Sequence, residues 1–159
     1  MGTGLHVRAA AVLCALALAA CSAPRIPGTD ITDTPDTRAI LELVERYRQA
    51  AERRDAATVL GLASQKYFDE SGTPDPADDV DYNQLLQKLP TDYARLTSVR
   101  LEISVRRVQV DGDKATADVF YDGRYRVVTK QGEVAKQASD VQRMTFVREG
   151  RAWKFLSGL

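Results

Sequence analysis

The spacing of apolar residues divides the chain into a helical first half and a strand-rich second half. Over residues 36–54, apolar side chains recur every three or four positions, as on one face of an amphipathic helix. These side chains are Ile40, Leu43, Val44, Tyr47 and Ala51. We expect Asp36 or Thr37 to cap this helix, and Asp55 to cap a second, shorter helix over residues 56–65.

A third helical pattern follows an acidic segment. Residues 69–81 are rich in Asp, Pro and Gly, a composition that is typical of a loop. Beyond the loop, apolar side chains again share one stripe, namely Tyr82, Leu85, Leu86, Leu89, Tyr93 and Leu96. Pro90 lies inside this stripe and is expected to kink the helix or to divide it in two.

After Ser98 the period of the pattern changes to two, as in half-buried strands. The alternation slips at Arg106-Arg107, which predicts a β-bulge, and it slips again between Val141 and Met144. Turns that contain glycine or clustered charged residues separate four strands, and these turns are residues 111–113, 130–133 and 149–151. Helices followed by an antiparallel meander predict an α+β domain.

The N-terminal segment has the features of an export signal. Residues 9–20 are almost wholly small or aliphatic, and the run is shorter than the ~20 residues that a membrane-spanning helix needs. It ends in Leu18-Ala19-Ala20-Cys21, which resembles the lipobox of bacterial lipoproteins. The resemblance implies cleavage before Cys21 and lipid on its thiol. Cleavage after Ala20 by an ordinary signal peptidase is the alternative.

We therefore expect three segments: a signal peptide over residues 1–20, a lipidated cysteine with a flexible tether over residues 21–36, and one domain over residues 37–159. Pro, Thr, Asp and Ser dominate the tether, which has too few apolar residues to form a core. Ser22 stands where an Asp favours inner-membrane retention in enteric bacteria. The expected location is the outer membrane, facing the periplasm.

Composition restricts the chemistry of the mature domain. The only histidine is His6, and the two cysteines are Cys14 and Cys21. Signal removal and acylation would leave no imidazole and no free thiol, which excludes Ser-His-Asp and Cys-His catalysis and His/Cys zinc sites. The net charge is +0, so nucleic-acid binding has no electrostatic support. We expect no cofactor.

The order of helices and strands resembles the NTF2-like superfamily, which includes SnoaL-like and ketosteroid-isomerase-like proteins. Two segments carry the resemblance most clearly, residues 46–62 (RYRQAAERRDAATVLGL) and residues 146–155 (FVREGRAWKF). The resemblance implies a curved sheet that helices wrap into a cone, with an internal pocket and often a dimer interface on the outer face of the sheet. Because the superfamily includes enzymes and non-catalytic proteins, the fold does not assign a function.

The isomerase branch directs attention to three residues. Tyr47 falls where that branch has a pocket tyrosine that donates to a developing oxyanion, although a core tyrosine is the simpler interpretation. Asp69 and Glu70 lie near the position of its carboxylate base, but ungapped counting from Tyr47 reaches Ser71. The dehydratase and cyclase branches usually use a His-Asp pair, for which the mature domain has no histidine.

Two tyrosines in the strand-rich half are further candidates for ligand binding. Tyr121 and Tyr125 surround Gly123, together with Arg124 and Arg126, and this cluster suits a pocket that stacks a ring or binds an anion. Cross-strand pairs on an exposed face are the alternative, which we favour.

The remaining acidic residues give weaker signals. The loop residues Asp75, Asp78, Asp79 and Asp81 lack the EF-hand pattern, so we expect a solvated loop and no metal site. Two further carboxylates lie on predicted strands, where each can face solvent, and these are Asp118 and Asp140.

The leading hypothesis is a lipid-anchored, non-catalytic module that binds a small hydrophobic ligand or an envelope protein, with a homodimer as one option. The alternative is an isomerase-like or lyase-like enzyme that uses Tyr47 and a carboxylate from Asp69 or Glu70 on a small hydrophobic ligand. A third option is an assembly factor acting through the outer face of the sheet. It requires a contiguous exposed apolar patch there.

Overall fold

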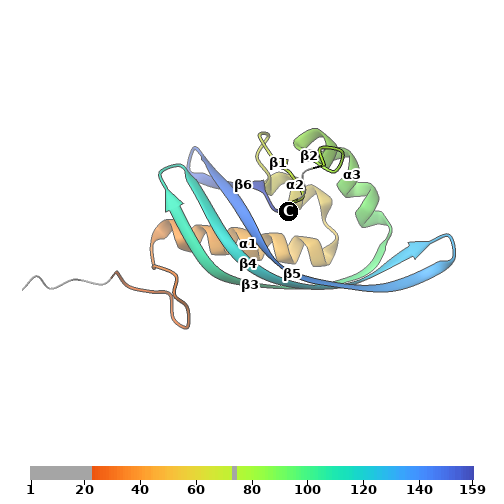
Figure 1. Cartoon of the computed structure of the whole chain (residues 1–159), viewed down its shortest axis with the longest axis horizontal. Helices are drawn as coiled ribbons and strands as arrows, with labels where there is room; N and C mark the ends of the chain where they lie inside the picture. The colour runs from red at the N-terminus through yellow and green to blue at the C-terminus, as the bar shows by residue number, and fades with distance from the viewer. Residues whose placement is uncertain (1–22, 73–74) are drawn as a thin grey trace, which may run out of the picture.

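The computed structural model describes residues 23–72 and 75–159 of the chain. Its main sheet is antiparallel, in the order β3-β4-β5-β6. The strands are β3 (Leu96–Asp111), β4 (Lys114–Thr129), β5 (Gly132–Glu149) and β6 (Ala152–Ser157). The three helices are α1 (Pro35–Arg53), α2 (Ala56–Leu62) and α3 (Tyr82–Ala94). The predicted α+β architecture, with N-terminal helices on a curved antiparallel sheet, is therefore confirmed (Figure 1).

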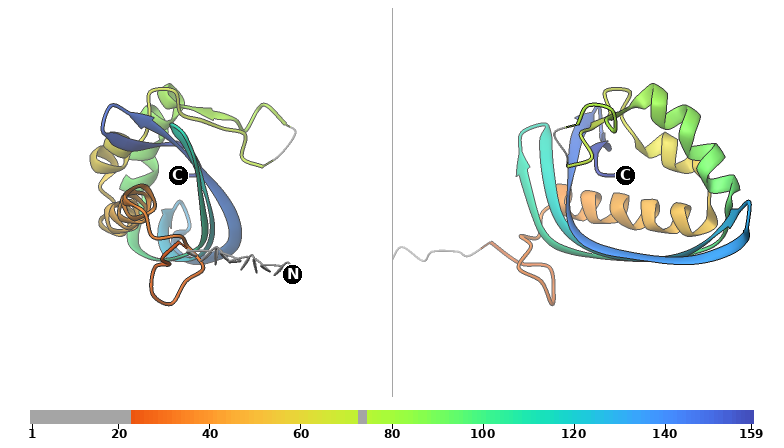
Figure 2. Two further views of the ribbon diagram at one scale, coloured as in Figure 1. Left: turned by 90° about the vertical axis from the view of Figure 1, so that its left-hand side faces the viewer. Right: turned by 45° about the vertical axis from the view of Figure 1, so that its right-hand side comes forward.

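The three long strands curve around the helices. Figures 1 and 2 show α1 lying along the concave side of the sheet, with α2 and α3 on the far side of the enclosed space. The core fills most of this space with buried side chains from α1 and from the concave faces of the strands. The largest of them include Ile40, Val119, Phe146 and Phe155. No helix in the described part of the chain is long and apolar enough to cross a membrane.

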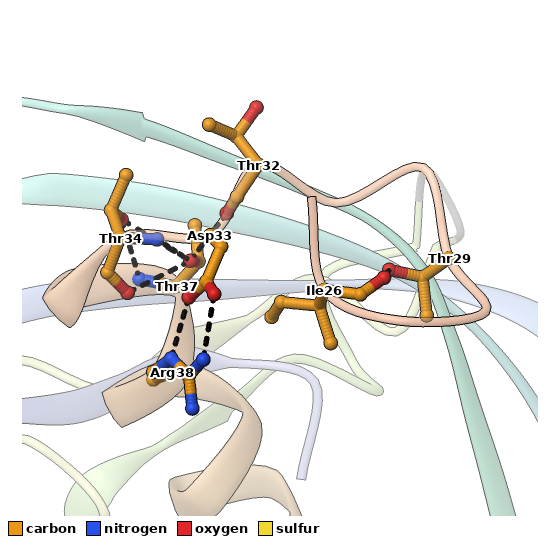
Figure 3. A network of polar contacts seen from close by, with 7 residues as sticks. All are labelled: Ile26, Thr29, Thr32, Asp33, Thr34, Thr37 and Arg38. Atoms are coloured by element: carbon orange, nitrogen blue, oxygen red, sulfur yellow. Dashed lines mark hydrogen bonds and ion pairs between the residues drawn. The ribbon is translucent and has the colours of Figure 1, made fainter. Parts of the chain in front are cut away.

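Helix α1 begins earlier than predicted, because Thr34 rather than Asp36 or Thr37 is its cap. The Thr34 hydroxyl accepts from the Thr37 N–H at 3.1 Å, and the Thr37 hydroxyl accepts from the Thr34 N–H at 2.9 Å (Figure 3). Pro35 occupies the first helical position, where its fixed φ and missing N–H are tolerated. Asp36 instead forms an ion pair with Arg148 at 2.7 Å.

The described residues before α1 form a loop with hydrogen bonds of its own. The Ile26 N–H donates to the Ile31 carbonyl at 2.9 Å, and the Asp33 N–H donates to the Pro24 carbonyl at 2.6 Å. Ile31 is only 2 % exposed, and Asp33 pairs with Arg38 at 2.5 Å. These contacts extend the folded domain upstream of residue 37.

Helix α2 is capped by Asp55, as predicted, through a 3.0 Å bond from the Thr58 N–H, but it ends at Leu62 instead of near residue 65. Helix α3 is one helix, so the predicted division at Pro90 is wrong. Pro90 is exposed, as is Leu86 one turn earlier, whose carbonyl has no N–H donor at position 90. Leu86 is itself 47 % exposed and does not belong to the buried stripe.

The acidic segment is not entirely a loop. Its two ends pair as the short strands β1 (Phe68–Asp69) and β2 (Val80–Asp81), and Asp81 then caps α3 through a 2.8 Å bond from the Gln84 N–H. The β-bulge predicted at Arg106-Arg107 is confirmed by a register shift between Val105 and Arg107.

The slip predicted between Val141 and Met144 is wrong. The β4–β5 register is continuous through this region. Val141 is 63 % exposed on the convex face, and Met144 is buried on the concave face. The residues therefore keep strict alternation, and an apolar residue on the outer face produced the apparent slip.

Helix α1 also bonds the free edge of β3. The Glu52 carboxylate accepts from the Leu101 N–H at 3.0 Å, and Arg48 donates to the Leu101 carbonyl at 3.4 Å. Arg54 donates to the Leu96 carbonyl at 2.6 Å. The Leu101 N–H and then Arg48 lower the pKa of Glu52 against the opposing effect of burial. These bonds satisfy edge groups that would otherwise face water or another strand.

We predict that Glu52→Ala lowers the free energy of unfolding by about 1–2 kcal/mol, because the Leu101 N–H and Arg48 lose a charged acceptor. The folded-state pKa of Glu52 lies below its ordinary value of 4.5, so the stabilisation is complete above that pH. It is lost as the pH falls through the lowered folded-state pKa. Urea unfolding followed by circular dichroism at several pH values measures the difference between the two proteins.

The matched control is Glu42→Ala, which removes an exposed carboxylate from the same helix and is expected to change stability by less than about 0.5 kcal/mol. Equal losses in both variants would contradict a specific bond between Glu52 and the β3 edge. So would a difference that persists unchanged in strong acid.

Candidate functional site

A cavity of about 300 Å³ lies inside the cone, between α1, the end of α3 and the concave face of the sheet. Val99, Leu101 and Ile103 of β3 supply much of its apolar wall. Four tyrosines contribute rings and hydroxyls, namely Tyr47, Tyr93, Tyr121 and Tyr125. We call this space the tyrosine cavity.

Strand alternation and one glycine place two of these tyrosines. Tyr121, Gly123 and Tyr125 are two positions apart on β4, so all three face the cavity. Gly123 has no side chain and leaves room between the two rings. Arg124 and Arg126 point to the opposite, convex face and are exposed. The prediction that this cluster lies on an exposed face is therefore wrong for the two tyrosines and correct for the two arginines.

Tyr47 contributes a hydroxyl group to the wall of the cavity. Its ring packs edge-on against Phe155, with 5.5 Å between centroids. Burial, and to a smaller extent Tyr121, raises the pKa of Tyr47 to about 12, so the hydroxyl stays protonated at neutral pH. None of the residues that the structure describes forms a hydrogen bond with it. Tyr47 is thus a neutral donor at the cavity wall.

The carboxylates proposed as a base do not join Tyr47. Asp69 accepts from the Gly158 N–H at 2.7 Å, from the Tyr67 hydroxyl at 3.1 Å and from the Ser71 N–H at 2.9 Å. Both of its oxygens therefore have structural partners. Glu70 is exposed on the surface.

Asp69 lines a different space, a hollow of about 610 Å³ beside β5 that we call the Asp69 hollow. Asp140 and Arg143 also line it. Tyr121, Gln142 and Leu159 border both the hollow and the tyrosine cavity. The structure therefore brings Tyr47, Tyr121 and Tyr125 together around one cavity, whereas Asp69 lines only the adjoining hollow and Glu70 lines neither space.

The described lining of the tyrosine cavity contains no carboxylate, lysine, arginine or histidine side chain. Its polar atoms are the tyrosine hydroxyls, the Gln142 amide and backbone groups. Such a lining can bind an apolar molecule and donate hydrogen bonds to it. It offers no side chain suited to removing a proton near neutral pH.

Two cavity residues had no functional assignment from the sequence. Tyr93 fits the apolar stripe of α3, so nothing in its spacing separates it from a core residue. The sequence does hold a sign of the role of Gln142, because it alternates with Met144 and Phe146 on the inward-facing side of β5. A polar residue at an inward position is typical of a lined cavity.

The described residues of the acidic loop and of the convex face give little evidence for a metal site or a protein-binding site. No group of three or more metal-ligating side chains occurs in residues 23–72 and 75–159. Asp118 lies on the convex face and pairs with Arg143 at 2.8 Å. Near the middle of this face, Val141 is exposed, and its cross-strand neighbour Phe120 is half-buried and lies under Arg106 at 5.5 Å. The described residues therefore form no broad apolar patch there of the kind that an assembly factor requires.

Residue Cys21 and the rest of the predicted signal lie outside the described residues. Lipidation therefore stays a prediction from the sequence.

Comparison with known proteins identifies the fold. No protein-family model and no curated protein matches the sequence. Among solved structures, Kfla4162 from Kribbella flavida is similar over 77% of this chain and 86% of its own, with TM-score 0.65 and 20% identity. An NTF2-like superfamily protein from Salmonella enterica is similar over 76% and 85%, with TM-score 0.62 and 13% identity.

A putative dehydratase of the NTF2-like family from Streptomyces avermitilis is similar over 77% of this chain and 94% of its own, with TM-score 0.56 and 19% identity. At such identities the similarity concerns the fold alone. The chain therefore has the NTF2-like fold, with N-terminal helices packed on a curved antiparallel sheet.

Proposed function

We propose that this chain is a lipid-anchored protein of the bacterial envelope whose NTF2-like domain binds a small, mostly apolar carbonyl compound without transforming it. The observation that carries the proposal is the unpaired, protonated Tyr47 hydroxyl at the wall of the tyrosine cavity. A carbonyl oxygen is the complementary group, because it accepts a hydrogen bond and carries no charge into an apolar space.

The size and lining of the cavity favour a compact ring-bearing ligand. A volume of about 300 Å³ is at the low end of the range for ligand pockets, ~300–1,000 Å³. Tyr121 and Tyr125 present their rings on one face of β4, with Gly123 between them, and Leu101 lies opposite on β3. Aromatic and aliphatic walls of this kind favour a flat apolar molecule.

The described lining of the tyrosine cavity includes no aspartate or glutamate, which supports binding over catalysis. An isomerase-like or lyase-like reaction needs a base within hydrogen-bond reach of the substrate proton. The acidic candidates Asp69 and Glu70 line the neighbouring hollow or the surface, and Asp69 is committed to Gly158 and Tyr67. The names of the structural neighbours include a putative dehydratase, but at 19% identity this supplies no residue for a reaction here.

The lipobox Leu18-Ala19-Ala20-Cys21 is the basis for the anchor. Helix α1 begins at Pro35. Tyr47 lies 12 residues further on, roughly 18 Å along the helix axis at 1.5 Å per residue. An anchor upstream of α1 therefore leaves the tyrosine cavity away from the point of attachment, where a ligand can reach it.

We predict that 2-acetylnaphthalene binds the wild-type chain and that Tyr47→Phe raises its Kd about fivefold, the effect of one neutral hydrogen bond. Naphthalene has the same rings and no carbonyl, so its Kd is expected to stay unchanged in the variant. Fluorescence titration measures both constants.

The control is Tyr82→Phe, which removes a tyrosine hydroxyl outside the cavity lining. A Tyr47→Phe variant that loses both ligands equally would contradict a hydrogen bond to the carbonyl. Incubation in deuterated water tests the enzyme alternative, because proton abstraction would exchange the hydrogens next to the carbonyl. Exchange catalysed by the wild type and lost in Asp69→Asn would refute the non-catalytic proposal.

For the anchor, we predict that Cys21→Ser produces an unprocessed precursor that carries no lipid in a bacterial host. The serine hydroxyl cannot form the thioether on which lipid attachment depends. Metabolic labelling with a radioactive fatty acid, followed by electrophoresis, detects both the label and the size of the chain. Normal cleavage of the variant would indicate an ordinary signal peptide, and the lipid anchor would be wrong.

A further inference from the structure

The first half of β5 forms an open edge of the main sheet. Strand β6 pairs only with residues 145–149 of β5, so residues 132–144 have β4 on one side and no strand on the other in the described structure. All side chains from residue 132 to residue 141 are exposed. Figure 1 shows the β4–β5 hairpin extending beyond the helices.

Two contacts show which backbone groups face this edge. The Val141 N–H donates to the adjacent Asp140 side chain at 2.7 Å, so it points away from β4. The Arg143 carbonyl lies against Gly158, on the same side. Backbone groups of alternate residues share a direction in a strand. The N–H and C=O groups of Ala135, Gln137 and Ser139 therefore also face outward.

The side chains along this edge are self-complementary in one register. If two copies of β5 pair antiparallel about Ala138, Lys136 of each copy lies opposite Asp140 of the other. Moving the axis to residue 137 or 139 pairs Lys136 with Ala138 or Gln142 and abolishes both copies of this charge pair.

Backbone geometry fits the same register. With odd-numbered groups facing outward, Gln137 and Ser139 form hydrogen-bonded pairs across the axis, as do Ala135 and Val141. Ala138 then pairs with its own copy in the close, non-hydrogen-bonded position, where Cα atoms are ~4.5 Å apart. An alanine fits such a close approach.

The β5 edge adjoins a hollow at one end, and one of its outward N–H groups already has a hydrogen-bond acceptor that pairing would displace. Asp140, Val141, Gln142 and Arg143 form one wall of the Asp69 hollow, about 610 Å³, beside which the partner's strand would end. In the isolated chain the Asp140 carboxylate covers the Val141 N–H. On pairing it turns to the partner's Lys136 and frees that N–H for the partner's Ala135 carbonyl.

We propose that the chain forms a homodimer by antiparallel pairing of residues 135–141 of β5 with the same residues of a second copy, which joins two sheets edge to edge. The dyad passes through Ala138, and the two Lys136–Asp140 pairs select the register. This proposal does not depend on the ligand of the tyrosine cavity.

The test is a charge-exchange cycle on the full chain in mild detergent, measured by sedimentation equilibrium with the detergent density-matched. Lys136→Asp and Asp140→Lys each replace two attractive contacts with two repulsive ones, so each is expected to raise the dimer Kd roughly 30-fold. The double exchange restores both attractions, and its Kd is expected within about threefold of the wild type.

The controls are Lys88→Asp and Glu70→Lys, which make similar charge changes at exposed positions outside β5 and leave the Kd unchanged. A monomeric wild type would overturn the proposal and would show that the Lys136 and Asp140 charges only protect the edge from pairing. A dimer that tolerates both single exchanges would overturn it as well, because association would then use another surface or the lipid. Failure of the double exchange to restore the dimer would refute the register.

Discussion

The docking of α1 on the edge of β3 is the interaction on which the cone depends. Glu52 and Arg48 bond the two backbone groups of Leu101, and the apolar face of the same helix packs into the concave side of the sheet. The helix thus forms hydrogen bonds with the open edge of the sheet and also contributes apolar side chains to the core. Tyr47 lies within one turn of this contact and points inward with the core residues. The same docking therefore closes the sheet around the tyrosine cavity and positions the donor inside it.

The cavity exists because the core does not fill the cone completely. Phe146, Phe155 and Met144 fill the end near β6, whereas Gly123 and Ala138 lie opposite each other on β4 and β5 and leave space at the other end. Tyrosines line this space, so the polar ends of large side chains meet in a mostly apolar interior. Burial raises the pKa values of Tyr47, Tyr67 and Tyr93, which keeps their hydroxyls neutral. Binding through neutral donors follows from this arrangement.

Much of the fold follows from local patterns in the sequence. The helix stripe of α1, the Asp55 cap and the bulge at Arg106 depend on neighbouring residues, and all three predictions are confirmed. The wrong predictions concern residues whose orientation depends on contacts between distant parts of the chain. Val141 is apolar yet faces solvent, and Tyr121 and Tyr125 face inward because the helices cover one side of β4. Asp69 bonds to Gly158, 89 residues away, and spacing along the chain cannot reveal such a contact.

The central claim is that the tyrosine cavity holds a ligand by its carbonyl. The most direct measurement is an isotope-edited nuclear Overhauser experiment on the labelled chain with 2-acetylnaphthalene. Cross-peaks between the ligand protons and the rings of Tyr47, Tyr121 and Tyr125 are predicted, with the acetyl methyl nearest to Tyr47. Cross-peaks to Phe120 and Val141 on the convex face, without any to the three tyrosines, would contradict the account.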